Sequence, residues 1–171
     1  MNSSHSSSER WAKAGDQDAG PTPILVIGYG NTLRGDDGVG PRAVETLSGM
    51  ELPGVRTLLC HQLAPEHAAP LSRANIAIFV DAAADGSKEV QWRKLEPARG
   101  AQVSAHAADP RSLLALARDV FGHSPEAWWV TIPAYRMEFG EDLTPQARQG
   151  LEAAVASIWR FAAPGSPHLS R

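Results

Sequence analysis

The amino-acid sequence predicts a three-layer α/β domain, with a mostly parallel, twisted central sheet of about five strands and helices on both faces. Two observations predict this class. Short, continuous apolar runs of the kind found in strands buried on both faces recur along the chain. Segments with helical apolar spacing separate these runs, and a strand–helix alternation is typical of parallel sheets.

The first half of the chain supplies three of the expected strands. The apolar run 24–27, closed by Gly28, predicts the first strand, and the spacing over 39–49 predicts a helix. A second strand is expected over 55–60. Pro65 and Glu66 suit a first helical turn, so a short helix is expected over 65–74. The run 76–80 is the strongest strand signal and leads directly into Asp81.

The second half continues the alternation. Val90, Trp92 and Leu95 indicate a half-exposed strand. Asp109 followed by Pro110 predicts the start of a helix that runs to Phe121, which Gly122 can end. A strand is expected over 128–132, and Thr144 followed by Pro145 begins the last helix. The expected buried stripe of that helix is Leu151, Val155, Ile158 and Trp159.

Both ends of the chain are expected to lie outside the folded domain, which we place at 23–162. Residues 1–22 contain no Val, Ile, Leu or Phe, so they bury too little apolar surface to offset the entropy of ordering. That segment also lacks the apolar stretch of a secretory signal. Residues 163–171 are rich in proline, glycine and serine, and we expect a second flexible tail there.

Composition excludes several function classes. The formal net charge of −3 and the lack of a basic block argue against nucleic-acid binding. The single cysteine, Cys60, makes neither an internal disulfide nor a cysteine-rich metal site. No apolar run is long enough to span a membrane. We therefore expect a soluble, cytoplasmic protein whose function depends on a local site.

The loop after the first strand, with the sequence GYGNTLRGDDGVG over 28–40, is the most informative segment. It lacks the Gly-Lys-[Ser/Thr] of a phosphate-binding loop, and Leu33 stands where a dinucleotide fingerprint needs its third glycine. A simpler interpretation is that Asp36 or Asp37 caps the following helix. That role accounts for one carboxylate, so we expect Asp37 to face the crevice above the sheet.

A second carboxylate, Asp81, follows the strongest strand. Ligands of open α/β sheets bind beyond the carboxyl ends of the strands, where the strand order reverses. If the first three strands lie in the order 2-1-3, Asp37 and Asp81 converge on one crevice. The alternative is that Asp81 only starts the turn over 82–86.

Among the histidines, His106 in a small-residue loop is the best-placed candidate and His61 the second, although a lone loop histidine is commonly a surface residue. Two carboxylates and an imidazole suit zinc or nickel, and they also suit acid–base chemistry. No serine nucleophile elbow is present, and Cys60 has no distinctive flanks. From the residues alone, the site is either metal-contacting or an acidic hydrolytic site.

The loop sequence over 28–40 closely resembles the opening signature of the nickel–iron hydrogenase maturation proteases. The resemblance continues, in the same order along the chain, through HQLAPE at 61–66, VDA at 80–82, SAH at 104–106 and FGEDLTP at 139–145. The first motif is long and specific. The others are weaker singly, and together they cover most of 24–160.

The resemblance implies an endopeptidase with a phosphorylase/hydrolase-like α/β fold, which removes a C-terminal extension from the nickel-loaded precursor of a hydrogenase large subunit. Position by position, the family's nickel-recognition residues fall on Asp37, Asp81 and His106, the expected catalytic and metal-contacting residues. The expected supporting loop residues are Gly30, Asn31, Asp36 and Gly38. The resemblance implies nickel carried by the substrate, with no tightly bound cofactor, and a monomer or weak homodimer.

Several alternatives stay open at this point. Nickel in the substrate either polarises the scissile carbonyl or serves as a checkpoint while Asp37 or Asp81 activates water. A module that binds a nickel-loaded partner without cutting it, a metalloenzyme with its own metal, and a nucleotide-binding protein are the competing classes.

Overall fold

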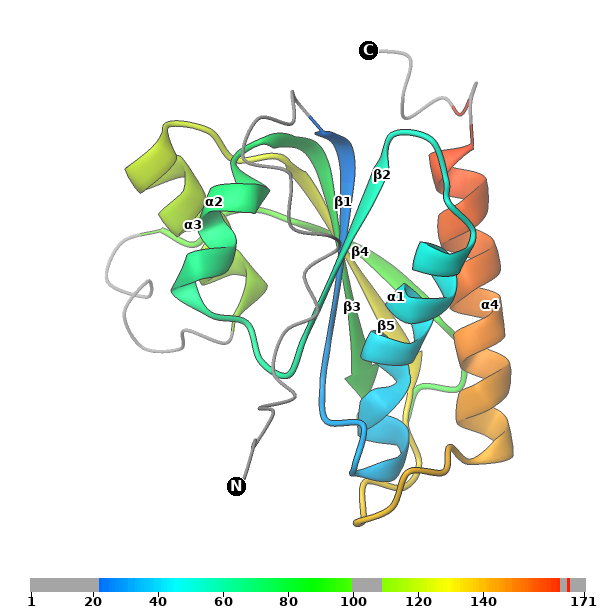
Figure 1. Ribbon diagram of the computed structural model, residues 1–171. Coiled ribbons are helices and arrows are strands. Elements are labelled where there is room, and N and C mark those ends of the chain that lie inside the picture. Colours follow the sequence, from blue (N-terminus) through cyan, green and yellow to red (C-terminus); the bar gives the residue numbers. More distant parts are fainter. Residues whose placement is uncertain (1–21, 100–108, 164–165, 167–171) are drawn as a thin grey trace, which may run out of the picture.

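The computed structural model describes residues 22–99, 109–163 and 166 of the 171-residue chain. Within those residues, one sheet is formed by β1 (Thr22–Tyr29), β2 (Val55–Cys60), β3 (Ala74–Ala83), β4 (Gln91–Leu95) and β5 (Glu126–Pro133). The helices are α1 (Val39–Gly49), α2 (Ala68–Leu71), α3 (Pro110–Phe121) and α4 (Pro145–Ala162), and two 3₁₀ turns cover Gly35–Gly38 and Pro65–His67 (Figure 1).

The strand order in the sheet is β2-β1-β3-β5-β4. β1 pairs in parallel with β2 and β3, and β3 pairs in parallel with β5, whereas β4 is an antiparallel edge strand. β1 and β3 have a partner on each side, and their apolar runs at 24–27 and 76–80 are buried, as expected for strands covered on both faces. The predicted mostly parallel sheet, including the order 2-1-3, is confirmed.

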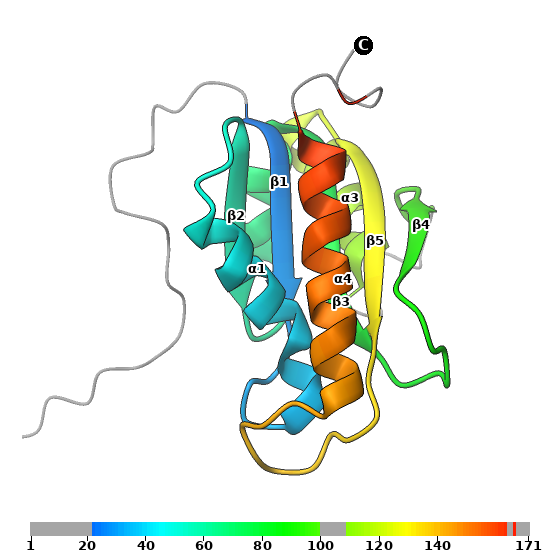
Figure 2. The ribbon, with the colours of Figure 1, turned by 90° about the vertical axis from the view of Figure 1, so that its right-hand side faces the viewer.

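Helices cover both faces of this sheet: α1 and α4 lie on one face, and α2 and α3 lie on the other (Figures 1 and 2). Successive strand side chains point to opposite faces. Val26 and Ile78 therefore pack with the helix residue Ile158 on one face, while Ile27 and Phe79 pack on the opposite face. The predicted three-layer arrangement is confirmed.

The predicted helix ends are also confirmed. Asp109 precedes α3 and its carboxylate accepts a hydrogen bond from the Arg111 amide at 2.9 Å. Gly122 ends that helix with φ at 78°, a conformation that favours glycine. Thr144 caps α4, because its hydroxyl oxygen accepts from the Ala147 amide at 3.2 Å.

Two local predictions are wrong. The short helix expected over 65–74 ends at Leu71, because Ala74 already pairs with Thr22 in the sheet. Trp159 does not belong to the buried stripe of α4 and is 48% exposed, whereas its neighbour Ile158 is fully buried. Adjacent residues of a helix point about 100° apart, so both cannot face the sheet.

The predicted tails fall almost wholly outside the described residues, and the predicted division into one domain and two tails stays a prediction. Thr22, which we placed in the first tail, is the first residue of β1. In the described part of the chain, no helix is both long and apolar enough to cross a membrane.

Candidate active site

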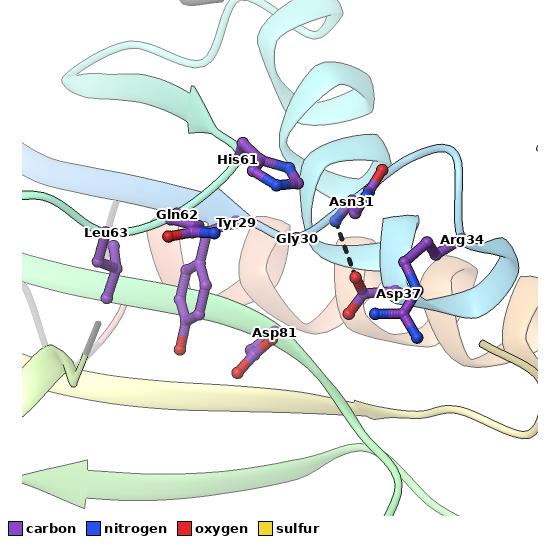
Figure 3. A pocket seen from close by; sticks show the side chains of 9 residues that line it. All are labelled: Tyr29, Gly30, Asn31, Arg34, Asp37, His61, Gln62, Leu63 and Asp81. Carbon is purple, nitrogen blue, oxygen red and sulfur yellow. Dashed lines mark hydrogen bonds between the residues drawn. The ribbon is translucent and has the colours of Figure 1, made fainter. Parts of the chain in front are cut away.

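A cavity of about 240 Å³ opens where β1, β2 and β3 reach their carboxyl ends (Figure 3). Its lining comes from the loop after β1, the loop after β2 and the end of β3, and consists of Tyr29, Gly30, Asn31, Arg34, Asp37, His61, Gln62, Leu63 and Asp81. The neighbouring positions of these strands bring Asp37 and Asp81 to one cavity, as the order 2-1-3 predicts.

Asp81 lies at the carboxyl end of β3 and is partly buried. One of its carboxylate oxygens accepts a hydrogen bond from the Ala82 amide at 2.8 Å. Burial is the main cause that raises the pKa of Asp81 to about 6, and the negative charge of Asp37 also raises it. The nearby Tyr29 hydroxyl and the Ala82 amide favour the ionised carboxylate and limit this rise. This carboxyl can therefore take up and release a proton near neutral pH.

Asp37 is oriented by the loop that carries it. One of its carboxylate oxygens accepts from the Asn31 amide at 3.1 Å, and the side-chain oxygen of Asn31 accepts from the Leu33 amide at 2.9 Å. Gly30 has φ at 139°, and a Cβ there would overlap the Asp37 carbonyl oxygen. At Gly38, a Cβ would lie 2.9 Å from the Thr32 Cα. The two glycines thus allow the chain to fold tightly around Asp37.

Asp36, the neighbouring acid, points away from the cavity and is fully buried. Its carboxylate accepts from the Tyr135 amide at 2.8 Å, the Arg136 amide at 3.0 Å, the Thr144 amide at 2.7 Å and the Thr144 hydroxyl at 2.8 Å. Burial acts to raise the pKa of Asp36, but these hydrogen bonds together lower it below its ordinary value.

The capping role considered for Asp36 and Asp37 is therefore wrong. Gly38 is the residue before α1, and no side chain caps that helix. The Asp36 carboxylate is used instead to hold the connection between β5 and α4 against the loop after β1.

Backbone hydrogen bonds join the same two segments, which lie side by side at the lower end of Figure 2. The Gly35 amide donates to the Gly140 carbonyl at 2.6 Å, and the Gly140 amide donates to the Leu33 carbonyl at 2.8 Å. Arg34, which lines the cavity, donates from its Nε to the Met137 carbonyl at 3.2 Å. The loop carrying Asp37 is therefore braced by a segment about 100 residues later in the chain.

The structure does not test the predicted role of His106. His106 lies within 100–108, outside the described residues. His61, the second candidate, is exposed at the cavity, and its carbonyl accepts from the Gly30 amide at 3.2 Å. His67 and His123 serve local structure: Nδ1 of His67 accepts from the Ala64 amide at 3.0 Å, and Nε2 of His123 donates to the Ala74 carbonyl at 3.1 Å.

Over 22–99, 109–163 and 166, no three His, Cys, Asp or Glu side chains lie close enough to hold a metal ion. Within these ranges, Asp37 and Asp81 are the carboxylates that line the cavity. Carboxylate oxygens and imidazole nitrogens are suitable ligands for nickel, so both aspartates could contribute to a site completed by other groups.

Tyr29 and Arg34 were missed as cavity residues by the sequence reasoning. Tyr29 is the last residue of β1, and its position at a carboxyl end was the available signal. Arg34 lies in the loop motif itself, but its direction depends on Met137, which is 103 residues away.

Comparison with solved structures shows the fold of the hydrogenase maturation proteases. The chain is similar to the [NiFe] hydrogenase maturation protease HybD from Thermococcus kodakarensis, with a TM-score of 0.64 and 21% identity over 82% of this chain and 99% of that one. The hydrogenase 2 maturation peptidase from a Thaumarchaeota archaeon gives a TM-score of 0.59 and 23% identity over 80% and 95% of the two chains.

The hydrogenase maturating endopeptidase HybD from E. coli gives a TM-score of 0.63 and 21% identity, over 80% of this chain and 89% of that one. No protein-family model matches the sequence, and no curated protein matches it. At these levels of identity, the structural likeness establishes the fold.

Proposed function

We propose that this chain belongs to the nickel–iron hydrogenase maturation proteases, and that it is an endopeptidase. Its proposed substrate is the nickel-loaded precursor of a hydrogenase large subunit, from which it removes the C-terminal extension. One observation carries the proposal: Asp37 and Asp81, which the sequence resemblance assigns to the family's nickel-recognition positions, line one cavity at the carboxyl edge of a sheet with this family's fold.

In the proposed reaction, Asp81 is the general base. Its carboxyl has a pKa of about 6, so its ionised form predominates at neutral pH and still accepts a proton from water effectively. Asp37 is oriented by the Asn31 amide and lies in a different segment of the chain from Asp81. The two carboxylates therefore take separate roles in the proposal: Asp37 contacts the nickel centre of the precursor, and Asp81 faces the attacking water.

We propose that His106 contacts the same nickel centre, on the basis of the sequence motif. Neutral imidazole and carboxylate both suit nickel. In this proposal the metal arrives with the substrate, and the protein acts in the cytoplasm as a monomer or weak homodimer. A non-cleaving module that only senses a nickel-loaded partner is the alternative.

The proposal is tested by incubating the purified full-length protein with a candidate precursor, nickel-loaded or nickel-free, and measuring the precursor's mass. We expect shortening of the nickel-loaded precursor and none of the nickel-free one. Binding of the nickel-loaded precursor without any mass change would support the non-cleaving alternative instead.

A pair of variants connects that activity to the cavity. Asp37→Asn is expected to lower the cleavage rate of nickel-loaded precursor at least about tenfold, since an amide is a weaker nickel ligand. Asp119→Asn makes the same chemical change at an exposed position on α3, where Asp119 pairs with Arg118, and is expected to leave the rate unchanged. Equal rates for both variants would remove Asp37 from the proposal.

A further inference from the structure

The Tyr29 hydroxyl is a buried polar group beside Asp81 that the proposed reaction has not yet used. Gly28 pairs with Val80 in the parallel register of β1 and β3, so Tyr29 and Asp81 follow at the next position of neighbouring strands. Both line the cavity, and Figure 3 shows the phenol ring extending from β1 toward the strand that carries Asp81.

This hydroxyl is buried and makes no well-formed hydrogen bond among the described residues, although it lies near enough to the Asp81 carboxylate to favour the ionised form of Asp81. The hydroxyl of Thr131, which is 2% exposed and pairs in register with Asp81 from the other side, also makes no well-formed hydrogen bond among these residues. A buried hydroxyl without a well-formed hydrogen bond is destabilising, and most native structures avoid it. The strand position of Asp81 is thus flanked on both neighbouring strands by buried hydroxyls that make no well-formed hydrogen bond.

Packing does not account for the Tyr29 hydroxyl. The ring packs against the apolar cluster on the α2–α3 face, which contains Leu25 and Ile27. A phenylalanine would provide the same ring contacts without the buried oxygen. The Trp129 indole nitrogen, which is also buried, lies near this hydroxyl. A hydroxyl that lies at a cavity and makes no well-formed hydrogen bond in the resting protein is suited to donate to an oxygen of a substrate.

We propose that Tyr29 is a catalytic residue, whose hydroxyl donates a hydrogen bond to the scissile carbonyl oxygen of the bound precursor. This inference rests on the proposed protease function. As the oxygen of water bonds to the carbonyl carbon, one water proton passes to Asp81 and the carbonyl π electrons move onto the oxygen held by Tyr29. The C–N bond then breaks, the carbonyl re-forms, and the proton on Asp81 passes to the leaving amine. Tyr29 keeps its proton throughout.

Tyr29→Phe tests the inference, because it removes the oxygen and keeps the ring. In the full-length protein with nickel-loaded precursor, we expect kcat to fall roughly 10²-fold, the typical effect of losing one oxyanion donor, while KM changes little. The midpoint of thermal unfolding should change little, because the lost hydroxyl makes no well-formed hydrogen bond in the resting protein. Tyr135→Phe, at the chain's other tyrosine, whose side chain is 51% exposed, is the matched control and should cleave normally.

Three outcomes would overturn the inference while leaving the protease function intact: a wild-type rate for Tyr29→Phe, a raised KM with unchanged kcat, or a rate loss that only matches a loss of folded protein. A kcat that recovers fully at higher pH would show that Tyr29 acts through Asp81, which also contradicts direct contact with the substrate. If the wild-type protein itself leaves the precursor intact, the proposed function fails and the inference fails with it.

Discussion

Asp36 and Asp81 are two carboxylates at the same edge of one sheet, and the protein treats them in opposite ways. Asp36 is fully buried and accepts four hydrogen bonds, which lower its pKa below the ordinary value. Asp81 is partly buried, accepts a hydrogen bond from the Ala82 amide, and has a pKa raised to about 6.

The difference separates a residue that stabilises the site from one that is available to react. The hydrogen bonds that Asp36 accepts from residues 135–144 fix the loop that carries Asp37. Asp81 lines the cavity and has unused acceptor capacity. Stabilising and reactive carboxylates thus differ in hydrogen-bond satisfaction more than in burial.

The largest expected effect on stability is that of Asp36→Ala. It removes a fully buried carboxylate and leaves three backbone amides and one hydroxyl without their acceptor, so we expect a loss of about 3 kcal/mol or more in the free energy of unfolding. Asp36→Asn should be nearly as harmful. Both carboxylate oxygens accept from backbone amides, so either orientation of the new amide places its NH₂ against a donor. Urea denaturation measures both variants, and a loss below 1 kcal/mol for Asp36→Asn would contradict the anchoring role.

The opposite change in the free energy of unfolding is expected when Asp81 is replaced. Asp81→Asn removes a group whose ionised form is disfavoured by burial, so the variant should be more stable than the wild type at neutral pH. The shift from 3.8 to about 6 corresponds to at most about 3 kcal/mol, and we expect roughly 1–2 kcal/mol after solvent exposure is considered. Urea denaturation at pH 7.5 provides the comparison, and a destabilised Asp81→Asn would place Asp81 among the structural residues.

The pH dependence of stability distinguishes Asp81 from Asp36 independently, with a smaller expected effect. The folded-state pKa of Asp81 lies above the ordinary 3.8, so its destabilising contribution is absent below pH 3.8, grows as the pH rises to about 6, and is constant above that. The stability advantage of Asp81→Asn over wild type should therefore increase between pH 4 and pH 6 and level off by pH 7.5. An advantage that is flat across this range would show that Asp81 does not titrate as the structure indicates.

For Asp36 the ionised carboxylate stabilises the folded protein, which is the reverse of Asp81. Its folded-state pKa lies below 3.8, so its stabilising contribution is complete above that pH and is lost as the pH falls through the folded-state value. Between pH 5 and pH 8, the stability difference between wild type and Asp36→Asn should stay constant. A difference that changes in that interval would mean that Asp36 is less well satisfied than its contacts indicate.

The sequence was sufficient to predict the sheet and the meeting of Asp37 with Asp81. Continuous apolar runs marked β1 and β3 as inner strands, and parallel topology then placed the residues after them at one edge. The partners of Asp36 were not predictable in this way, because they lie 99–108 residues later and depend on how the β5–α4 connection folds back.

Tyr29 shows a second limit of sequence reasoning. An aromatic residue at the end of an apolar strand is expected to pack in the core, and its ring does so. That its hydroxyl would make no well-formed hydrogen bond depends on the geometry of three strands together. The role of His106 stays a prediction from its motif, since it falls outside the described residues.

The most direct test of the contrast between the two carboxylates is the cleavage rate of nickel-loaded precursor by Asp81→Asn at pH 7.5. Loss of a general base commonly costs 10²–10⁴-fold, so we expect a rate at least about 10²-fold below that of the wild type from a protein that is at least as stable. Full cleavage by Asp81→Asn would contradict the account, since the buried and under-satisfied carboxylate would then have no part in the reaction.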